Sequence, residues 1–252
     1  MSGHSKWSTI KRKKEATDSK RGQVFTKLAR EVSVAAKQGG GDPETNFRLR
    51  LAIQKARTVN MPAENIKRAI EKATADGAGA ANFEEILYEG YGPGGAAVIV
   101  EALTDNRNRT VAEVRNVFNR AGGRLGEAGS VGWLFEERGL LVVEPTSGQE
   151  TDDITLGAIE AGAEDFNEAE DGLVEVYTQL HDLKTVEEAL TAQGFTVTSA
   201  EKTYVPKTTV EPSEAEAQSV LRLIDKVEDL DDVQGVYTNL QVDSEVAANA
   251  SV

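Results

Sequence analysis

Lysine and arginine side chains, which can bind phosphate groups, are concentrated at the N-terminus of this sequence. Residues 1–72 hold 17 lysines and arginines against 7 acidic residues, a local net charge of +10. The whole chain of 252 residues has a net charge of −14, so the residues after 72 carry −24. Basic blocks of this kind commonly bind nucleic-acid backbones, because they release the counterions condensed there. We therefore predict that the N-terminal region binds nucleic acid.

A helix that ends near Lys37 must position many of these cations. Apolar residues recur along it at one-turn spacing and form one stripe, which consists of Val24, Phe25, Leu28, Ala29, Val32, Ala35 and Ala36. Burial of this stripe turns the cations that lie off it toward solvent. Lys37 has a second interpretation, since a cation at a helix C-terminus interacts favourably with the helix dipole. The run from Lys11 to Lys14 has no such use in folding, because adjacent like charges repel one another.

Two further features are open to more than one interpretation. Trp7 is an indole among cations, which suits either base stacking or docking on the helices behind it. Five arginines gather on and around a later predicted helix and could form a second phosphate contact; they are Arg107, Arg109, Arg115, Arg120 and Arg124. Arg115 and Arg120 have an alternative, which is pairing with nearby carboxylates such as Glu113. The predicted nucleic-acid-binding residues are Lys6, Trp7, Lys11, Arg12, Lys13, Lys14, Lys20, Arg21, Lys27, Arg30, Arg107 and Arg109.

Residues that could support catalysis are scarce. The chain has no cysteine and only two histidines, His4 and His181, so a histidine-based acid–base pair or metal site has few ligands to draw on. We find no nucleophile elbow, phosphate loop, zincin helix or calcium loop. The Gly92-Pro93-Gly94-Gly95 segment resembles a phosphate cradle, but a turn between two strands explains its glycines. We predict a protein that is not an enzyme and has no cofactor or metal.

Acidic residues dominate a later segment. Between Leu140 and Leu183 there is no lysine or arginine, while 12 aspartates and glutamates occur. They could form a metal site, but no short spacing repeats a ligand pattern. We favour a solvated acidic surface that keeps this segment off nucleic acid or directs it toward a basic protein.

The basic region is predicted to form a three-helix bundle. Gly39-Gly40-Gly41 ends the first helix, and Asp42-Pro43 is predicted to start the second, with Asp42 as N-cap and Pro43 in the first turn. Asn60-Met61-Pro62 separates the second helix from a third, in which Ile66, Ala69, Ile70 and Ala73 share one face. The segment from Asp76 to Ala81 has the composition of a linker, so we place the first domain boundary there.

Two α+β modules follow. Strands at 86–91 and 96–103 precede a helix that Thr110 and Glu113 are predicted to start as a capping box, and a strand at 131–135 closes this module. The next module is a β-α-β-α-β run with strands at 140–143, 173–177 and 195–201 and helices at 153–161 and 186–193. The final helix and the last strand, at 236–242, cannot fold alone. We predict that they return to the earlier module, whose sheet has only one helix to cover it.

The predicted fold is therefore a multi-domain α and α+β protein. Its N-terminal three-helix bundle precedes two small α+β sandwich domains, and the third domain is inserted in the second. The predicted ranges are 1–78, then 79–138 with 208–243, the inserted 139–207, and a tail at 244–252.

Several motifs together resemble the YebC/PmpR family over most of the chain, from residue 1 to about 242. The matching segments are Gly3-His4-Ser5-Lys6-Trp7, Lys20-Arg21-Gly22, Phe25-Thr26-Lys27-Leu28, Asn60-Met61-Pro62, residues 88–95, residues 104–110 and Gly129-Ser130-Val131. The resemblance implies three domains, one helical and two α+β. It also implies a role in gene expression, since members are described as probable DNA-binding transcriptional regulators and some as translational activators that act with ribosomes.

Residues and resemblance together predict a monomeric regulator of gene expression that is bound to nucleic acid. We favour a translational activator on ribosomal RNA or the ribosome, with a regulator bound to duplex DNA as the alternative and a protein-interaction scaffold as the third. The absence of a long apolar run predicts a chain with no membrane segment, and the absence of cysteine favours the cytoplasm.

Overall fold

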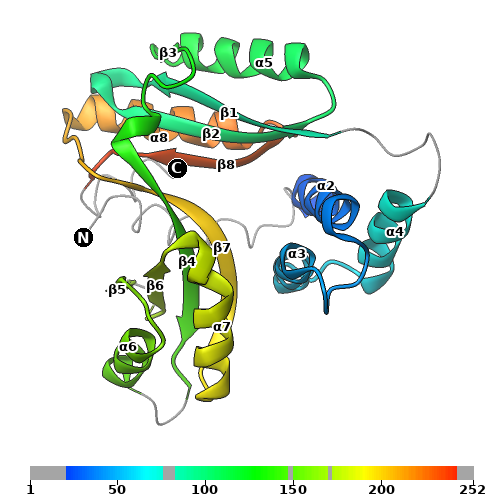
Figure 1. The fold of residues 1–252 in the computed structure, drawn as a ribbon. Coiled ribbons are helices and arrows are strands. Elements are labelled where there is room, and N and C mark those ends of the chain that lie inside the picture. The colour runs from blue at the N-terminus through cyan, green and yellow to red at the C-terminus, as the bar shows by residue number, and fades with distance from the viewer. Residues whose placement is uncertain (1–20, 76–82, 147–149, 170–171, 243–252) are drawn as a thin grey trace. The chain divides into compact units, whose positions relative to one another are not determined.

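The computed structural model describes residues 21–75, 83–146, 150–169 and 172–242 (Figure 1). Two compact units make up the chain, one of Glu136–Val205 and the other of Ser2–Phe135 with Pro206–Val252. The first unit thus interrupts the second, and the predicted multi-domain α and α+β fold with an inserted domain is confirmed. The residue ranges that we assigned to three domains stay a prediction.

The N-terminal helices pack around one apolar core. They are α2 (Arg21–Gly39), α3 (Phe47–Thr58) and α4 (Ala63–Thr74). The predicted stripe of α2 is buried at Leu28, Val32, Ala35 and Ala36, because α3 and α4 both pack against it. Ile66 of α4 is buried in the same core, as its spacing predicts.

The connection between α2 and α3 differs from our prediction. Helix α3 begins at Phe47, and its N-cap is Asn46 rather than Asp42, so the start predicted at Asp42-Pro43 is wrong. Asn46 is buried and serves both helices. Its Oδ1 accepts a hydrogen bond from the Leu49 amide at 3.1 Å, while its Nδ2 donates to the carbonyl oxygens of Ala35 and Gly40, each at 2.8 Å. One amide side chain therefore satisfies backbone groups at two helix ends, which Asp42 could not do.

The first α+β sheet has the strand order β3-β1-β2-β8 (Figure 1). Its strands are β1 (Glu84–Tyr91), β2 (Ala97–Thr104), β3 (Arg124–Leu125) and β8 (Val233–Thr238), and they pair antiparallel. Helices α5 (Arg107–Arg120) and α8 (Glu214–Glu228) share a core with one face of this sheet. Strand β8 pairs with β2, so the final helix and strand do return to this sheet.

Three predicted boundaries in this part are wrong. Helix α5 begins one turn before Thr110, with Asn106 as its N-cap, and Thr110 is a buried residue inside it. Residues 132–134 form a 3-10 turn instead of a strand, and strand β4 (Phe135–Glu144) follows it. The last strand ends at Thr238 rather than at 242.

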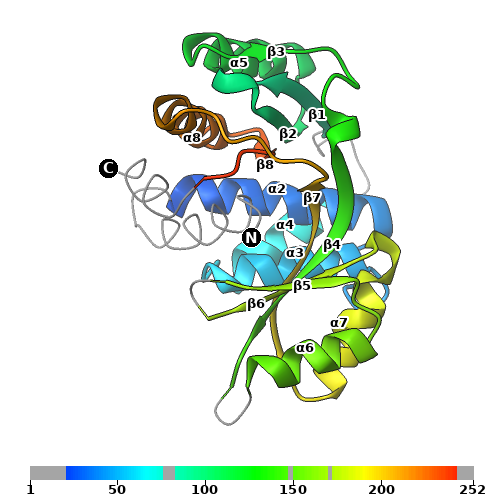
Figure 2. The same cartoon turned by 90° about the vertical axis from the view of Figure 1, so that its left-hand side faces the viewer.

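The inserted unit has its own sheet, with the strand order β5-β6-β4-β7. It contains β4, β5 (Asp165–Glu168), β6 (Val174–Thr178), β7 (Thr196–Pro206), α6 (Thr151–Glu160) and α7 (Leu183–Ala192). Helices α6 and α7 lie side by side (Figure 2). Strand β5 was not predicted, because its sequence Asp-Phe-Asn-Glu is mostly polar and its residues are mostly exposed.

Candidate nucleic-acid interface

Part of the predicted interface lies outside the described residues. This holds for Lys6, Trp7, Lys11, Arg12, Lys13, Lys14 and Lys20. Arg21 is the first residue of α2. The role of these residues in binding stays a prediction.

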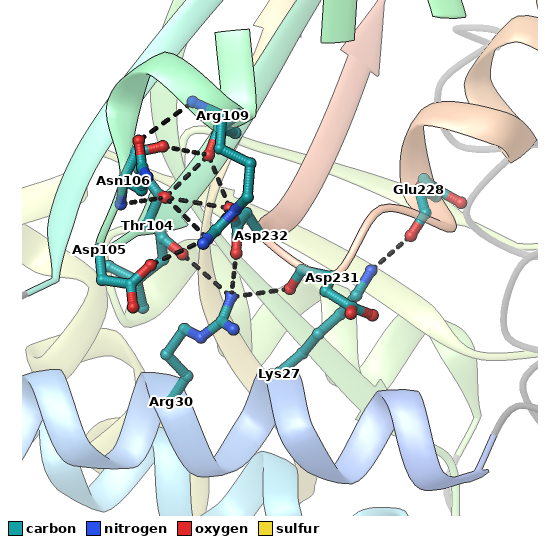
Figure 3. Close-up of polar contacts among 11 residues, drawn as sticks. Lys27, Arg30, Thr104, Asp105, Asn106, Arg109, Glu228, Asp231 and Asp232 are labelled. Atoms are coloured by element: carbon teal, nitrogen blue, oxygen red, sulfur yellow. Dashed lines mark hydrogen bonds and ion pairs between the residues drawn. The ribbon is translucent and has the colours of Figure 1, made fainter. Parts of the chain in front are cut away.

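Lys27 and Arg30 leave α2 from one side and contact backbone and side-chain oxygens (Figure 3). The Lys27 ammonium donates to the carbonyl oxygen of Glu228, the last residue of α8. Arg30 is mostly buried, with 14% of its side chain exposed. Its Nη1 lies 2.9 Å from the carbonyl oxygen of Asp231 and 2.8 Å from the Asp232 carboxylate. These two cations therefore face the loop between α8 and β8 rather than open solvent.

The Asp232 carboxylate is the centre of this polar cluster, which Figure 3 shows in detail. Its Oδ1 accepts from Arg30, while its Oδ2 accepts from Arg109 at 2.7 Å, from Thr110 at 2.6 Å and from Thr104 at 3.0 Å. Only 3% of the Asp232 side chain is exposed. A carboxylate this deeply buried requires such partners, because an unpaired buried charge is costly.

The electrostatics of the cluster favour the charged form of Asp232. Burial raises the pKa of its carboxyl, but hydrogen bonds from Thr110, Arg109 and Thr104 and the charge of Arg30 outweigh it, so the pKa lies below its ordinary value. The same contacts act on Arg109, whose pKa is raised by its hydrogen bonds to Asp232 and Asp105. Arg109 and Asp232 thus stay ionised together near neutral pH.

The segment from Thr104 to Thr110 owes its geometry to this cluster. Strand β2 ends at Thr104, and Asn106 caps α5 by accepting from the Arg109 amide at 3.1 Å. This cap directs the side chains of Arg109 and Thr110 from the first turn of α5 to one carboxylate. Sequence reasoning found Arg30 and Arg109 but missed Asp232. Its neighbours Asp229 and Asp231 are also acidic, so nothing local distinguishes it.

The remaining arginines of α5 are exposed. Within the described parts of the chain, Arg107, Arg115 and Arg120 make no ion pair, and the predicted alternative of an Arg115 pair with Glu113 is not observed. Exposed amides accompany them at Asn108, Asn116 and Asn119, and α5 contains a single acidic residue. Guanidinium and amide groups are the donors that most often contact phosphate and sugar oxygens. This face of α5 can therefore bind an anionic backbone.

Neither a candidate metal site nor a membrane-spanning helix occurs among the described residues. No group of three or more histidine and acidic side chains within the described ranges could hold a metal ion. None of the described helices combines the length and the apolar character that a transmembrane span requires.

Comparison with known proteins agrees with this architecture. The profile of the TACO1/YebC protein N-terminal domain matches residues 5–76, and that of the TACO1/YebC second and third domain matches residues 83–240. Together they span most of the sequence. The chain belongs to the TACO1/YebC family.

Curated relatives match over nearly their whole length. A protein of Herpetosiphon aurantiacus is 53% identical, with 98% of this chain and 97% of the relative covered, and is named a probable transcriptional regulatory protein. A protein of Pelotomaculum thermopropionicum with the same name is 54% identical, with 96% and 100% covered. Among solved structures, a conserved hypothetical protein from Aquifex aeolicus is 45% identical and superposes with a TM-score of 0.83, covering 90% of this chain and 92% of that one.

Proposed function

We propose that this protein regulates gene expression as a translational activator that binds ribosomal RNA, without enzymatic activity of its own. Its relatives are named as regulators of gene expression, and the two basic regions suit a phosphate-rich partner. The observation that carries the proposal is that Arg107, Arg115 and Arg120 on α5 are exposed and make no ion pair with any described residue, in a part of the chain that is otherwise acidic.

The predicted residues take two different roles in this function. The lysines and arginines among residues 6–21, together with Arg107, Arg115 and Arg120, contact the phosphates. Arg30 and Arg109 act as positioning residues, since both donate to Asp232 and thereby fix α2 and α5 to one point. Lys27 supports the same arrangement through Glu228. The basic N-terminal segment and the exposed arginines of α5 can together contact separated stretches of RNA backbone.

Ribosomal RNA is favoured over DNA because the amino-acid sequence of the basic regions does not show the usual features of proteins that read base sequence. Such readers present a few side chains to base edges from one recognition helix and often pair half-sites through a dimer. The alternative is a transcriptional regulator bound to duplex DNA, which the printed names of the relatives favour. A scaffold that uses the acidic inserted unit is the third candidate, but it leaves the basic N-terminus without a role.

Cosedimentation with ribosomes tests the proposal. We propose that the protein is a cytoplasmic monomer when it is not bound to a ribosome. At moderate salt it should sediment together with ribosomes. Charge reversal of Lys11, Arg12, Lys13 and Lys14 together should release it while the fold stays intact, because backbone binding depends on the number of phosphate contacts. A protein that stays free of ribosomes and protects one defined promoter sequence from cleavage would establish the transcriptional alternative instead.

A further inference from the structure

Trp133 is an exposed aromatic ring that the fold nevertheless holds in place. It lies in the 3-10 turn Gly132–Leu134, and 67% of it is exposed. Its Nε1 donates a hydrogen bond to the carbonyl oxygen of Ser130 at 3.2 Å. Burial of an indole ring normally stabilises a fold, so an exposed indole such as Trp133 contributes little to stability. Its exposed surface is available to a binding partner.

A carboxylate clamps the loop that carries this ring. Oε1 of Glu89 accepts from the amide of Gly129 at 2.7 Å, and Oε2 accepts from the amides of Val131 at 2.7 Å and Gly132 at 2.6 Å. Burial raises the pKa of Glu89, but these backbone hydrogen bonds outweigh it and lower the pKa below its ordinary value. The loop therefore keeps its shape without using the Trp133 ring for packing.

The loop lies on the face of the sheet opposite α5. Gly90 of β1 faces α5, since a Cβ atom there would meet the Phe118 ring at 2.6 Å. Side chains alternate along a strand, so Glu89 and Tyr91 point to the other face. Tyr91 donates from its hydroxyl to the same Ser130 oxygen that accepts from Trp133, at 2.9 Å. The two aromatic residues are thus joined through one carbonyl group.

Positive charge lies beside the Tyr91 ring. Arg124 of β3 is paired with Tyr91 across the sheet, and its guanidinium lies 5.4 Å from the centre of the Tyr91 ring. Arg124 is exposed. An exposed ring with a guanidinium group nearby on the same surface suits single-stranded nucleic acid, in which a base stacks on the ring and the cation contacts a phosphate.

We propose that Trp133 stacks on an unpaired base of RNA, with Arg124 at a phosphate next to that base. A protein partner is disfavoured, because among the described residues of this unit only Leu87 is a further exposed large hydrophobic residue, and a lone ring is too small an apolar patch for a protein interface. The inference rests on the proposed RNA-binding function and adds a preference for RNA with unpaired nucleotides.

Binding of the full-length chain to two RNA probes tests the inference. One probe is a short RNA duplex, and the other is the same duplex with an unpaired adenosine tail. Wild-type protein should prefer the tailed probe. Trp133→Ala should weaken binding to the tailed probe by about tenfold and leave duplex binding unchanged, because stacking contributes only to the unpaired base. Trp133→Tyr should keep most of the affinity, since it retains an aromatic face.

A matched control and a second readout separate stacking from folding. Leu156→Ala removes another exposed apolar side chain, 60% exposed and in the inserted unit, and should bind both probes like wild type. The chain has two tryptophans, Trp7 and Trp133, so in Trp7→Phe protein the fluorescence reports on Trp133 alone. The tailed probe should quench this fluorescence, and the duplex should not.

The outcomes distinguish the two proposals. If Trp133→Ala binds both probes like wild type, or loses affinity for both alike, the stacking inference is wrong while RNA binding stands. If wild-type protein binds neither probe at low salt, the proposed function fails and the stacking inference fails with it.

Discussion

The guanidinium of Arg30 lies 2.8 Å from the carboxylate of Asp232, 202 residues further along the chain. Arg30 belongs to the N-terminal helices, and Asp232 immediately precedes the last strand of the first α+β sheet. Arg109, at the start of α5, donates to the other oxygen of the same carboxylate. Two cations that sequence reasoning assigned to nucleic acid therefore share an internal acid, and this sharing fixes α2 relative to α5.

Removal of the Asp232 charge should destabilise the protein. In Asp232→Asn, Arg30 loses its buried ion pair and Arg109 loses one of its two carboxylate partners. Breaking a buried pair from one side typically costs about 3 kcal/mol, and the loss at Arg109 is smaller because that side chain is 43% exposed. Urea unfolding measures the difference. Asp231→Asn is the matched control, because Arg30 contacts only the backbone oxygen of Asp231; an equal loss in both variants would contradict the assignment.

The contribution of Asp232 should also depend on pH. Its pKa is lower in the folded protein than the value of about 3.9 expected in the unfolded chain. The stabilisation is therefore present above pH ~4 and is lost as the pH falls through the folded-state pKa. The difference in unfolding free energy between wild type and Asp232→Asn should be constant from about pH 5 to pH 7 and shrink in more acidic solution. A difference that grows toward acid pH would have the wrong sign for this carboxylate.

The exposed arginines of α5 should contribute to RNA binding without contributing to stability. Arg115→Ala or Arg120→Ala should reduce the slope of log affinity against log salt concentration by somewhat less than 1, because each removes about one phosphate contact. Their unfolding midpoints should match wild type, since neither side chain makes an ion pair within the described residues. Arg109→Ala is the contrasting variant and should lower stability through Asp232. If neither variant changed the slope of log affinity against log salt concentration, α5 would not be part of the RNA-binding interface.

The division of the chain into domains predicts how a truncation behaves. Deletion of residues 214–242 removes α8 and β8, which bury Val220, Leu221 and Val236 against the first sheet. Amides of β1 and β2 should then lose protection in hydrogen exchange, while those of β4 and β6 in the inserted unit keep theirs. If both sheets lost protection to the same extent, or if neither did, the predicted domain ranges would be wrong.

The sequence by itself determined the features that depend on local periodicity and composition. The apolar faces of α2 and α4 are buried where their spacing predicts, and the surplus of one helix and one strand indicated their return to the first sheet. The charge separation between residues 1–72 and the rest is likewise a property of composition. Each of these signals involves many residues, so a few atypical positions do not hide it.

Only the tertiary structure decided which single residues meet. Asn46 replaced Asp42 as a cap because its amide reaches carbonyl groups of the preceding helix, and Thr110 lies inside α5 because its hydroxyl reaches Asp232. The clamp of Glu89 on the loop of Trp133 likewise joins residues about 40 positions apart. Such contacts depend on the path of the whole chain, since a hydrogen bond requires its two groups to lie within about 3 Å of each other. Hydrophobic spacing fixes which face of an element is buried, but it does not fix which polar groups meet when those faces pack.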